Sequence, residues 1–179
     1  DVAGVTIIGL GTGSKRPTLT LTTAASATIG VTAANISMVN VVVSANFADI
    51  TSAFTLGAAP YFSLYAVDIV ATATNMNFLH VIDTGTVTND ALGLSVVNCN
   101  WFEPDALTLA FALVDGSNAK WDISDNTMIT GAATQDVAAV FTIAAGKVLT
   151  QLKNYRNYVQ IAGHANTTAG LWLTTDGTT

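Results

Sequence analysis

Three pairs of carboxylates are the residues of this chain whose types and spacing suit acid–base chemistry. They are Asp83 with Asp90, Glu103 with Asp105, and Asp122 with Asp125. Cleavage of a glycosidic bond needs a proton donor together with a base or nucleophile at a set distance, and two carboxyl groups can supply both. A working pair would make the chain an enzyme that cleaves polysaccharides.

The surroundings of these acids favour a different role. Each pair stands beside an expected turn, and acids next to Gly, Asn or Pro more often form turns and carry solubilising charge. Lys153 and Arg156 lie well downstream, and nothing in the sequence aligns them with an acid. We therefore expect no catalytic residue and no enzymatic activity.

The histidines and the cysteine give no second chemistry. His80 takes the place of Asn in a recurring segment, where we expect a hydrogen-bonding corner residue, and His164 lies in a Gly-His-Ala-Asn loop. Without a third His or a Cys–His spacing, we expect no metal site. The single cysteine, Cys99, excludes an intrachain disulfide framework, and its apolar strand predicts a buried small hydrophobe.

A glycine cluster after the first apolar run invites comparison with nucleotide-binding loops. It runs Gly9-Leu10-Gly11-Thr12-Gly13-Ser14, so Ser14 replaces the third glycine of the dinucleotide fingerprint. The next residues, Lys15-Arg16-Pro17, lead into a Thr/Leu alternation where a helix should begin to hold the pyrophosphate. The phosphate-loop pattern also fails around Lys15. We expect a tight turn between strands and no cofactor.

Seven aromatic side chains allow two interpretations. They are Trp101, Trp121, Trp172, Tyr61, Tyr65, Tyr155 and Tyr158. One interpretation is a sugar-binding platform, and the other is stacking in the core or contact between subunits. We favour the second, because aromatic side chains fill apolar interiors and are enriched at protein interfaces.

Composition sets the class of the protein. The chain has 179 residues, half of them apolar and only 10% charged, which suits one domain over residues 1–179 with a sizeable core. A net charge of −6 and six scattered basic residues exclude a nucleic-acid partner. The charge-free stretch after Pro17 alternates with period two and is interrupted by Thr, Asn and Ser, so we expect no membrane span. Because the chain opens on Asp1, we expect a fragment or part of a longer chain.

The elements that must position these residues are short strands. Thr, Val and Ile are abundant, whereas Gly, Asn and Asp punctuate the runs. The predicted strands are Val5–Leu10, Thr18–Thr22, Ala27–Thr32, Ile36–Ser44, Tyr61–Val70, Met76–Ile82, Leu92–Val97, Trp101–Phe102, Leu107–Val114, Trp121–Ile123, Met128–Ile129, Val137–Ile143, Val148–Leu152, Tyr158–Ile161 and Leu171–Leu173. Between Val137 and Tyr155 a broken helix is the alternative, although Gly146 and Thr142-Ile143 favour extended chain.

A segment of apolar strand, Asn-centred turn and second apolar strand recurs along the chain. Units too small to bury their own apolar face become stable by stacking on their neighbours. We expect Asn40, Asn98, Asn126 and Asn154 at the corners, since Asn tolerates left-handed backbone, and variable loops at Asp49–Pro60 and Asp83–Ala91. The side chains expected to be mostly buried are Ile36, Met38, Met76, Phe78, Cys99, Ile123 and Leu152.

Three stretches carry a resemblance to a known family. The opening residues 1–19, the segment Val97-Asn98-Cys99-Asn100-Trp101-Phe102, and the segment Ile123-Ser124-Asp125-Asn126-Thr127-Met128-Ile129 resemble the rungs of right-handed parallel β-helix proteins of the pectate-lyase-like superfamily, particularly those on tailed bacteriophage particles. The resemblance implies an all-β, right-handed parallel β-helix.

The same resemblance implies two classes of function. The first is a structural protein of the phage virion, such as a decoration, fibre or spike module, which would form a homotrimer and contact other virion proteins. The second is a carbohydrate-active tailspike, or a polysaccharide lyase or hydrolase, acting on host surface glycans. An adhesin or another binding module is a further alternative. We expect the structural class, because the sequence shows no convincing acid–base constellation.

Overall fold

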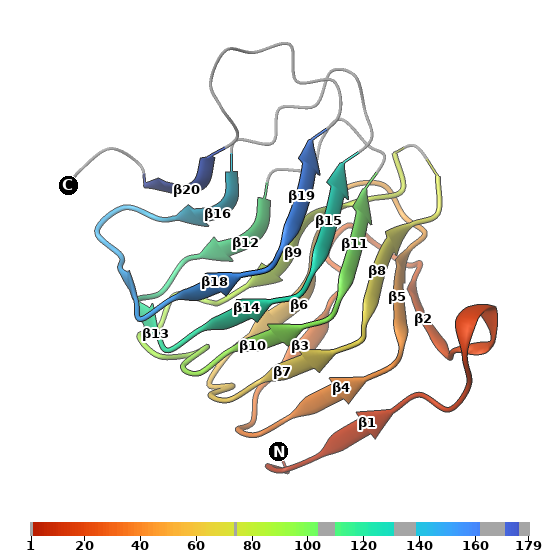
Figure 1. Cartoon of the computed structure of the whole chain (residues 1–179), viewed down its shortest axis with the longest axis horizontal. Coiled ribbons are helices and arrows are strands. Elements are labelled where there is room, and N and C mark those ends of the chain that lie inside the picture. Colours follow the sequence, from red (N-terminus) through yellow and green to blue (C-terminus); the bar gives the residue numbers. More distant parts are fainter. Residues whose placement is uncertain (1, 74, 104–109, 131–138, 162–170, 176–179) are drawn as a thin grey trace.

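The chain coils into a parallel β-solenoid of about five turns (Figure 1). The computed structural model describes residues 2–73, 75–103, 110–130, 139–161 and 171–175. The N-terminus lies at one end of the coil, and each turn stacks on the one before it. The predicted parallel β-helix is therefore confirmed.

Three six-stranded parallel sheets form the walls over the described residues. Sheet A contains β1 (Thr6–Ile8), β4 (Ser37–Val39), β7 (Ser63–Tyr65), β10 (Ser95–Val97), β14 (Asp122–Ser124) and β18 (Lys153–Tyr155). Sheet B contains β2 (Thr18–Leu21), β5 (Val42–Ala45), β8 (Asp68–Ala71), β11 (Asn100–Glu103), β15 (Thr127–Thr130) and β19 (Tyr158–Ile161). Sheet C contains β3 (Ile29–Val31), β6 (Ile50–Leu56), β9 (Phe78–Asp83), β12 (Ala110–Val114), β16 (Ala139–Ile143) and β20 (Leu171–Thr175).

Three smaller elements complete the described chain. The strand β13 (Asn118–Ala119) pairs in parallel with β17 (Leu149–Thr150). A single turn of 3₁₀-helix, η1 (Gly13–Lys15), lies between β1 and β2. None of the described residues form a helix with the length and hydropathy that a membrane crossing requires.

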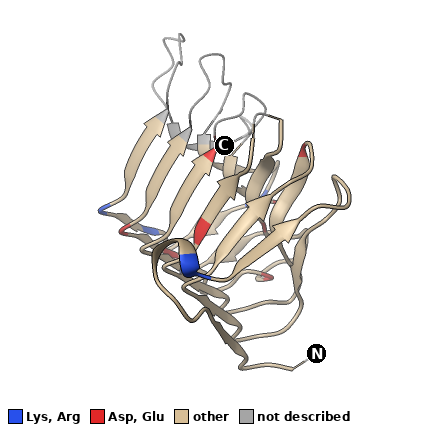
Figure 2. Cartoon of the chain, turned by 90° about the vertical axis from the view of Figure 1, so that its right-hand side faces the viewer, with Lys and Arg blue, Asp and Glu red and all other residues tan. Residues whose placement is uncertain are grey.

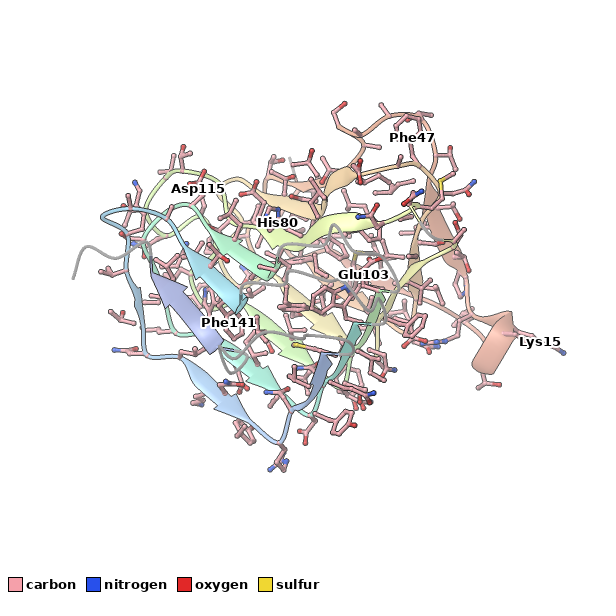
Figure 3. All side chains as sticks on the ribbon, turned by 90° about the horizontal axis from the view of Figure 1, so that it is seen from above. Lys15, Phe47, His80, Glu103, Asp115 and Phe141 are labelled. Atoms are coloured by element: carbon pink, nitrogen blue, oxygen red, sulfur yellow. The ribbon has the colours of Figure 1, made fainter. Side chains whose placement is uncertain are left out.

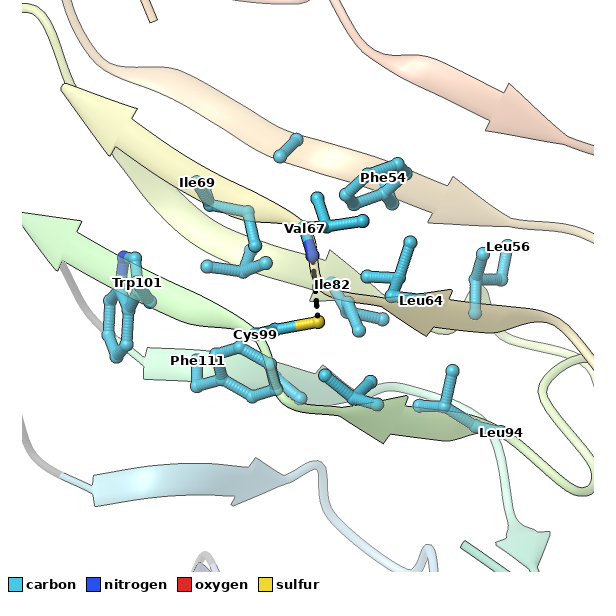
Figure 4. Packing of buried hydrophobic residues seen from close by; sticks show 14 of the residues in the cluster. Phe54, Leu56, Leu64, Val67, Ile69, Ile82, Leu94, Cys99, Trp101 and Phe111 are labelled. Carbon is cyan, nitrogen blue, oxygen red and sulfur yellow. Dashed lines mark hydrogen bonds between the residues drawn. The ribbon is translucent and has the colours of Figure 1, made fainter. Parts of the chain in front are cut away.

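The core consists of side-chain files that run along the solenoid axis (Figure 4). Residues in register on successive strands of one sheet point into the coil and stack on one another. The file of sheet A runs Met38, Leu64, Val96 and Ile123, that of sheet B runs Val43, Ile69, Trp101 and Met128, and that of sheet C runs Phe54, Ile82, Ala112 and Phe141. All twelve side chains are buried. This stacking explains why so apolar a chain still folds as short strands.

Left-handed backbone marks two corners of each turn. Between sheets A and B the corner residues Asn40, Ala66, Asn98, Asp125 and Arg156 have φ of 52–58°. Between sheets C and A, Asn35, Tyr61, Gly93, Lys120 and Gln151 have φ of 56–70°. Asn adopts this conformation more readily than most residues, so the expectation of corner residues at Asn40 and Asn98 is confirmed.

The other two predicted Asn corners are wrong in position. Asn126 follows the left-handed Asp125 and points inward, whereas Asn154 lies within β18. Asn126 Oδ1 accepts a hydrogen bond from the Cys99 N–H at 2.8 Å, and Asn126 Nδ2 donates to the Val96 carbonyl at 2.9 Å. Asn157 repeats the pattern one turn later, with the Asn126 N–H and the Ile123 carbonyl as its partners. These amides tie consecutive turns together instead of shaping the bend.

Several predicted element boundaries need correction. The stretch Asp49–Pro60, expected to be a loop, contains the seven-residue strand β6, whose Ile50, Phe54 and Leu56 are fully buried. The predicted strands Ile36–Ser44 and Tyr61–Val70 are each divided in two by a left-handed residue, and β13 and β18 were not predicted. Of the predicted strand Val137–Ile143, the described residues form β16, so the preference for a strand over a helix is confirmed there. Residues 137 and 138 lie outside the described residues.

The expected core is largely confirmed. Four of the seven residues predicted to be buried have less than 4% of their surface exposed, namely Met38, Phe78, Cys99 and Ile123. The other three, Ile36, Met76 and Leu152, are half-buried. Ile36 and Leu152 still pack against the core cluster.

Truncation of an inner-file residue should destabilise the solenoid far more than truncation of an outward one. Phe54→Ala removes a fully buried ring that packs 5.5 Å from the Phe62 ring, and we expect a loss of about 3–5 kcal/mol. Phe102→Ala is the matched control, because Phe102 points outward from β11 and is 46% exposed; we expect less than about 1 kcal/mol. Urea denaturation followed by circular dichroism gives both values, and equal losses would contradict the inward and outward assignment.

Candidate functional site

Asp83 and Asp90 stabilise the corner loop between β9 and β10. Asp83 Oδ1 accepts a hydrogen bond from the Gly85 N–H at 2.9 Å. Asp90 is only 7% exposed, and its two oxygens accept from the N–H groups of Ala58 at 2.8 Å and Val87 at 3.2 Å. Both carboxylates thus accept hydrogen bonds from backbone N–H groups, as turn residues commonly do.

Glu103 lies inside the solenoid rather than in a surface loop (Figure 3). It ends β11, points to the same side as Trp101, and has no exposed surface. Its Oε2 accepts a hydrogen bond from the Phe78 N–H at 3.4 Å, on the preceding turn. The proposed partner of this pair, Asp105, lies outside the described residues. Alternation along β11, with Trp101 and Glu103 on one face, was the sequence signal for its inward orientation.

Asp122 and Asp125 are placed on different elements and in different surroundings. Asp122 begins β14 on the outer side of sheet A, whereas Asp125 occupies the corner that follows the strand. Arg156, one turn further on, contacts Asp125 through two hydrogen bonds, Nε to Oδ1 at 2.6 Å and Nη2 to Oδ2 at 2.7 Å. This guanidinium also lies 4.6 Å from the centroid of the Tyr155 ring.

The ion pair fixes the protonation of Asp125. Hydrogen bonding to Arg156 lowers the pKa of the Asp125 carboxyl, so the group is ionised near neutral pH. An ionised carboxylate cannot serve as the proton donor that glycosidic cleavage requires. Asp125 therefore cannot supply the proton in such a pair, and only the role of base or nucleophile is left to it.

A second interturn ion pair lies on the outer face of sheet B. Arg16, which follows η1, pairs with Asp68 of β8, and the Asn100 Nδ2 donates to the other Asp68 oxygen at 2.8 Å. Figure 2, which faces sheet B, shows charged residues that are few and scattered over the ribbon. Neither Arg16–Asp68 nor Arg156–Asp125 was foreseen, because the partners are far apart in the sequence.

Cys99 and His80 are both buried within the turns. Cys99 Sγ accepts a hydrogen bond from the Val67 N–H at 3.5 Å, and burial raises the pKa of the thiol to about 11. His80 lies within β9 and not at a corner, so its predicted position is wrong. Its Nδ1 is 3.3 Å from the Thr51 carbonyl oxygen, and burial lowers its pKa. Within the described ranges, no three His, Cys, Asp or Glu residues gather as metal ligands do. His164 lies outside the described residues.

The aromatic residues separate into core and surface sets. Trp101 and Trp121 are buried and pack against Phe111 and Phe141 respectively, as expected of core aromatics. The four tyrosines are 42–56% exposed. Nothing is described of the Trp172 side chain in β20.

Two of the exposed tyrosines lie in one outward file at the edge of sheet A. We call this the lateral file; in register it runs Ile8, Val39, Tyr65, Val97, Ser124 and Tyr155. Ile8, Tyr65 and Tyr155 are 60%, 51% and 42% exposed. Five of its six residues are apolar or aromatic and none is charged, so the file can bury surface against another protein.

Comparison with protein-family models, with curated proteins and with solved structures finds no match to this chain.

Cys99 should be inert in the folded protein. At pH 8 a thiol with a pKa of about 11 is almost entirely protonated, and Cys99 is 97% buried, so we expect a thiol-specific chromogenic disulfide to leave it unmodified for hours. In 8 M urea the same reagent should modify one thiol per chain within minutes. Rapid modification of the folded chain would contradict the burial of Cys99.

Proposed function

We propose that this chain is a non-enzymatic structural protein of a bacteriophage particle, a decoration, fibre or spike module that forms a homotrimer in the virion. Its partners would be other copies of the chain and other virion proteins. The phage assignment and the pectate-lyase-like family rest on the resemblance of three sequence segments. The solenoid supports the proposal as a regular scaffold whose outer surface can contact neighbours along its whole length.

The lateral file is the observation that carries the proposal. It places three exposed large side chains, Ile8, Tyr65 and Tyr155, in one outward file that has no charged member, with the half-buried Val39 and Val97 and the buried Ser124 between them. Protein interfaces are enriched in aromatic residues and depleted of acids and lysine. A file that runs along the solenoid also suits assembly about an axis parallel to it, because contacts can then form at several turns along its length.

A carbohydrate-active protein is the second candidate, and one group of residues favours it. Tyr155, Arg156 and Tyr158 are exposed next to one another beside Asp125, and exposed rings with charged neighbours suit sugar binding. For cleavage, Asp125 cannot supply the proton, because Arg156 holds it ionised, so the acid would have to come from another residue. Host surface glycans would on this view be the ligand.

The oligomeric state tests the structural proposal. Size-exclusion chromatography with multi-angle light scattering should give a mass of about three times 18.4 kDa, close to 55 kDa. Tyr65→Asp should dissociate the trimer by introducing charge into the lateral file. Tyr61→Asp is the matched control, since Tyr61 is equally exposed at the corner between sheets C and A. A monomer, or dissociation by both variants alike, would refute the lateral interface.

An activity assay separates the structural candidate from the enzyme. We expect capsular polysaccharides and lipopolysaccharides to remain intact, with no new reducing ends and no unsaturated products after prolonged incubation. Product formation that disappears in Asp122→Asn or Asp125→Asn would overturn the proposal in favour of the enzyme. Activity that persists in both variants would exclude this pair as its source and leave the other two pairs of carboxylates to be tested in the same way.

A further inference from the structure

A small pocket lies on the outside of the solenoid, where the corner between sheets C and A leads into β14 and β18. Its volume is about 250 Å³, and it is lined by Lys120, Trp121, Asp122, Gln151 and Lys153. This place is distinct from the lateral file, which runs along the opposite ends of the same strands. Ligand pockets for drug-sized molecules measure roughly 300–1,000 Å³, so this one suits a smaller molecule.

The walls of the pocket come from two consecutive turns that are held in register. Lys120 and Gln151 are the left-handed corner residues of these turns. The Lys120 N–H donates to the Thr150 carbonyl at 3.0 Å, and the Lys153 N–H donates to the Trp121 carbonyl at 2.8 Å. The indole of Trp121 is also held in place, because its Nε1 donates a hydrogen bond to the Ala91 carbonyl at 2.9 Å. The polar groups therefore project from a rigid base.

The charge of the pocket is opposite to that of the whole chain. Two of the six basic residues line it together with a single carboxylate, whereas the chain carries a net charge of −6. A ligand with one negative charge would neutralise the group of Lys120, Lys153 and Asp122. The long lysine side chains can place their ammonium groups on a carboxylate as charge-assisted donors.

Asp122 adds a requirement for a hydrogen-bond donor. Its Oδ1 is buried and accepts no hydrogen bond from any residue that the structure describes. This holds although Lys153 lies opposite Asp122 in the register of β14 and β18. A buried acceptor without a partner is unfavourable, so rotation of the Asp122 carboxylate toward the pocket, where a ligand hydroxyl can donate to it, would favour a hydroxyl over an apolar group of the same size.

We propose that this pocket binds a small hydroxycarboxylate, with its carboxylate on Lys120 and Lys153 and a hydroxyl donating to Asp122. The combination of a net positive charge and an acceptor in one small pocket selects for both groups in one molecule. The proposal concerns binding alone and is independent of the trimer, so either can fail without the other.

Three small probes test this selectivity on the unmodified protein. D-Glycerate carries a carboxylate and hydroxyls, propionate carries the carboxylate alone, and glycerol carries the hydroxyls alone. In NMR titrations at low ionic strength, we expect saturable shifts of the Lys120, Trp121 and Gln151 amides with D-glycerate. The affinity for propionate and glycerol should be at least about tenfold lower. Equal affinities for D-glycerate and propionate would reduce the pocket to a simple anion site and overturn the proposal, as would the absence of saturable shifts.

Variants assign the roles within the pocket. Lys153→Gln should weaken D-glycerate binding about tenfold, and Asp122→Asn should abolish the preference for D-glycerate over propionate. Lys15→Gln is the matched control, because Lys15 is exposed on η1 at the far end of the solenoid and should leave binding unchanged. Circular dichroism confirms that each variant is folded. Tighter binding of L-serine than of D-glycerate would show that Asp122 selects an ammonium group, and would also overturn the proposal.

Discussion

The stacking of each turn on its neighbours in strict register is the constraint on which the rest of the structure depends. A single turn of this chain contributes three short strands, which are too small to bury an apolar face alone. Register aligns Leu64 with Val96 and Val96 with Ile123. One file therefore buries apolar side chains from several turns against one another. Parallel pairing also supplies the backbone hydrogen bonds along the coil. Burial and hydrogen bonding are therefore two consequences of one alignment.

The same register places chemistry-bearing side chains side by side. Arg156 and Asp125 are 31 residues apart in the chain yet form a two-point ion pair, because each occupies the same corner of adjacent turns. Asn126 and Asn157 repeat one set of backbone contacts in the same way. The lateral file and the pocket at Lys120 and Lys153 arise from this rule as well. In a solenoid, a surface feature is built by residues one turn apart, and its length grows with the number of turns.

The sequence was sufficient to predict the class of fold, but it was not sufficient to predict the contacts between turns. Short apolar strands separated by Asn, Gly and Asp turns predicted a parallel solenoid, and Asn40 and Asn98 were placed correctly because their left-handed backbone is a local property.

The length of a turn is not constant. Successive corners between sheets A and B lie at residues 40, 66, 98, 125 and 156, a spacing of 26, 32, 27 and 31 residues. Without a fixed period, Arg156 could not be aligned with Asp125, nor Asn154 with its place in β18. The strand β6 was missed for another reason, since its small residues Ser52 and Ala53 weaken the apolar signal although both are buried.

Nuclear Overhauser effects between methyl groups test most directly the register that joins each turn to both neighbours. In a sample with labelled Leu, Val and Ile methyls, Val96 should show cross-peaks to Leu64 and to Ile123, its partners on the preceding and following turns. Cross-peaks from Val96 to only one of its partners, or to residues paired in antiparallel order, would contradict the solenoid and every surface feature derived from it.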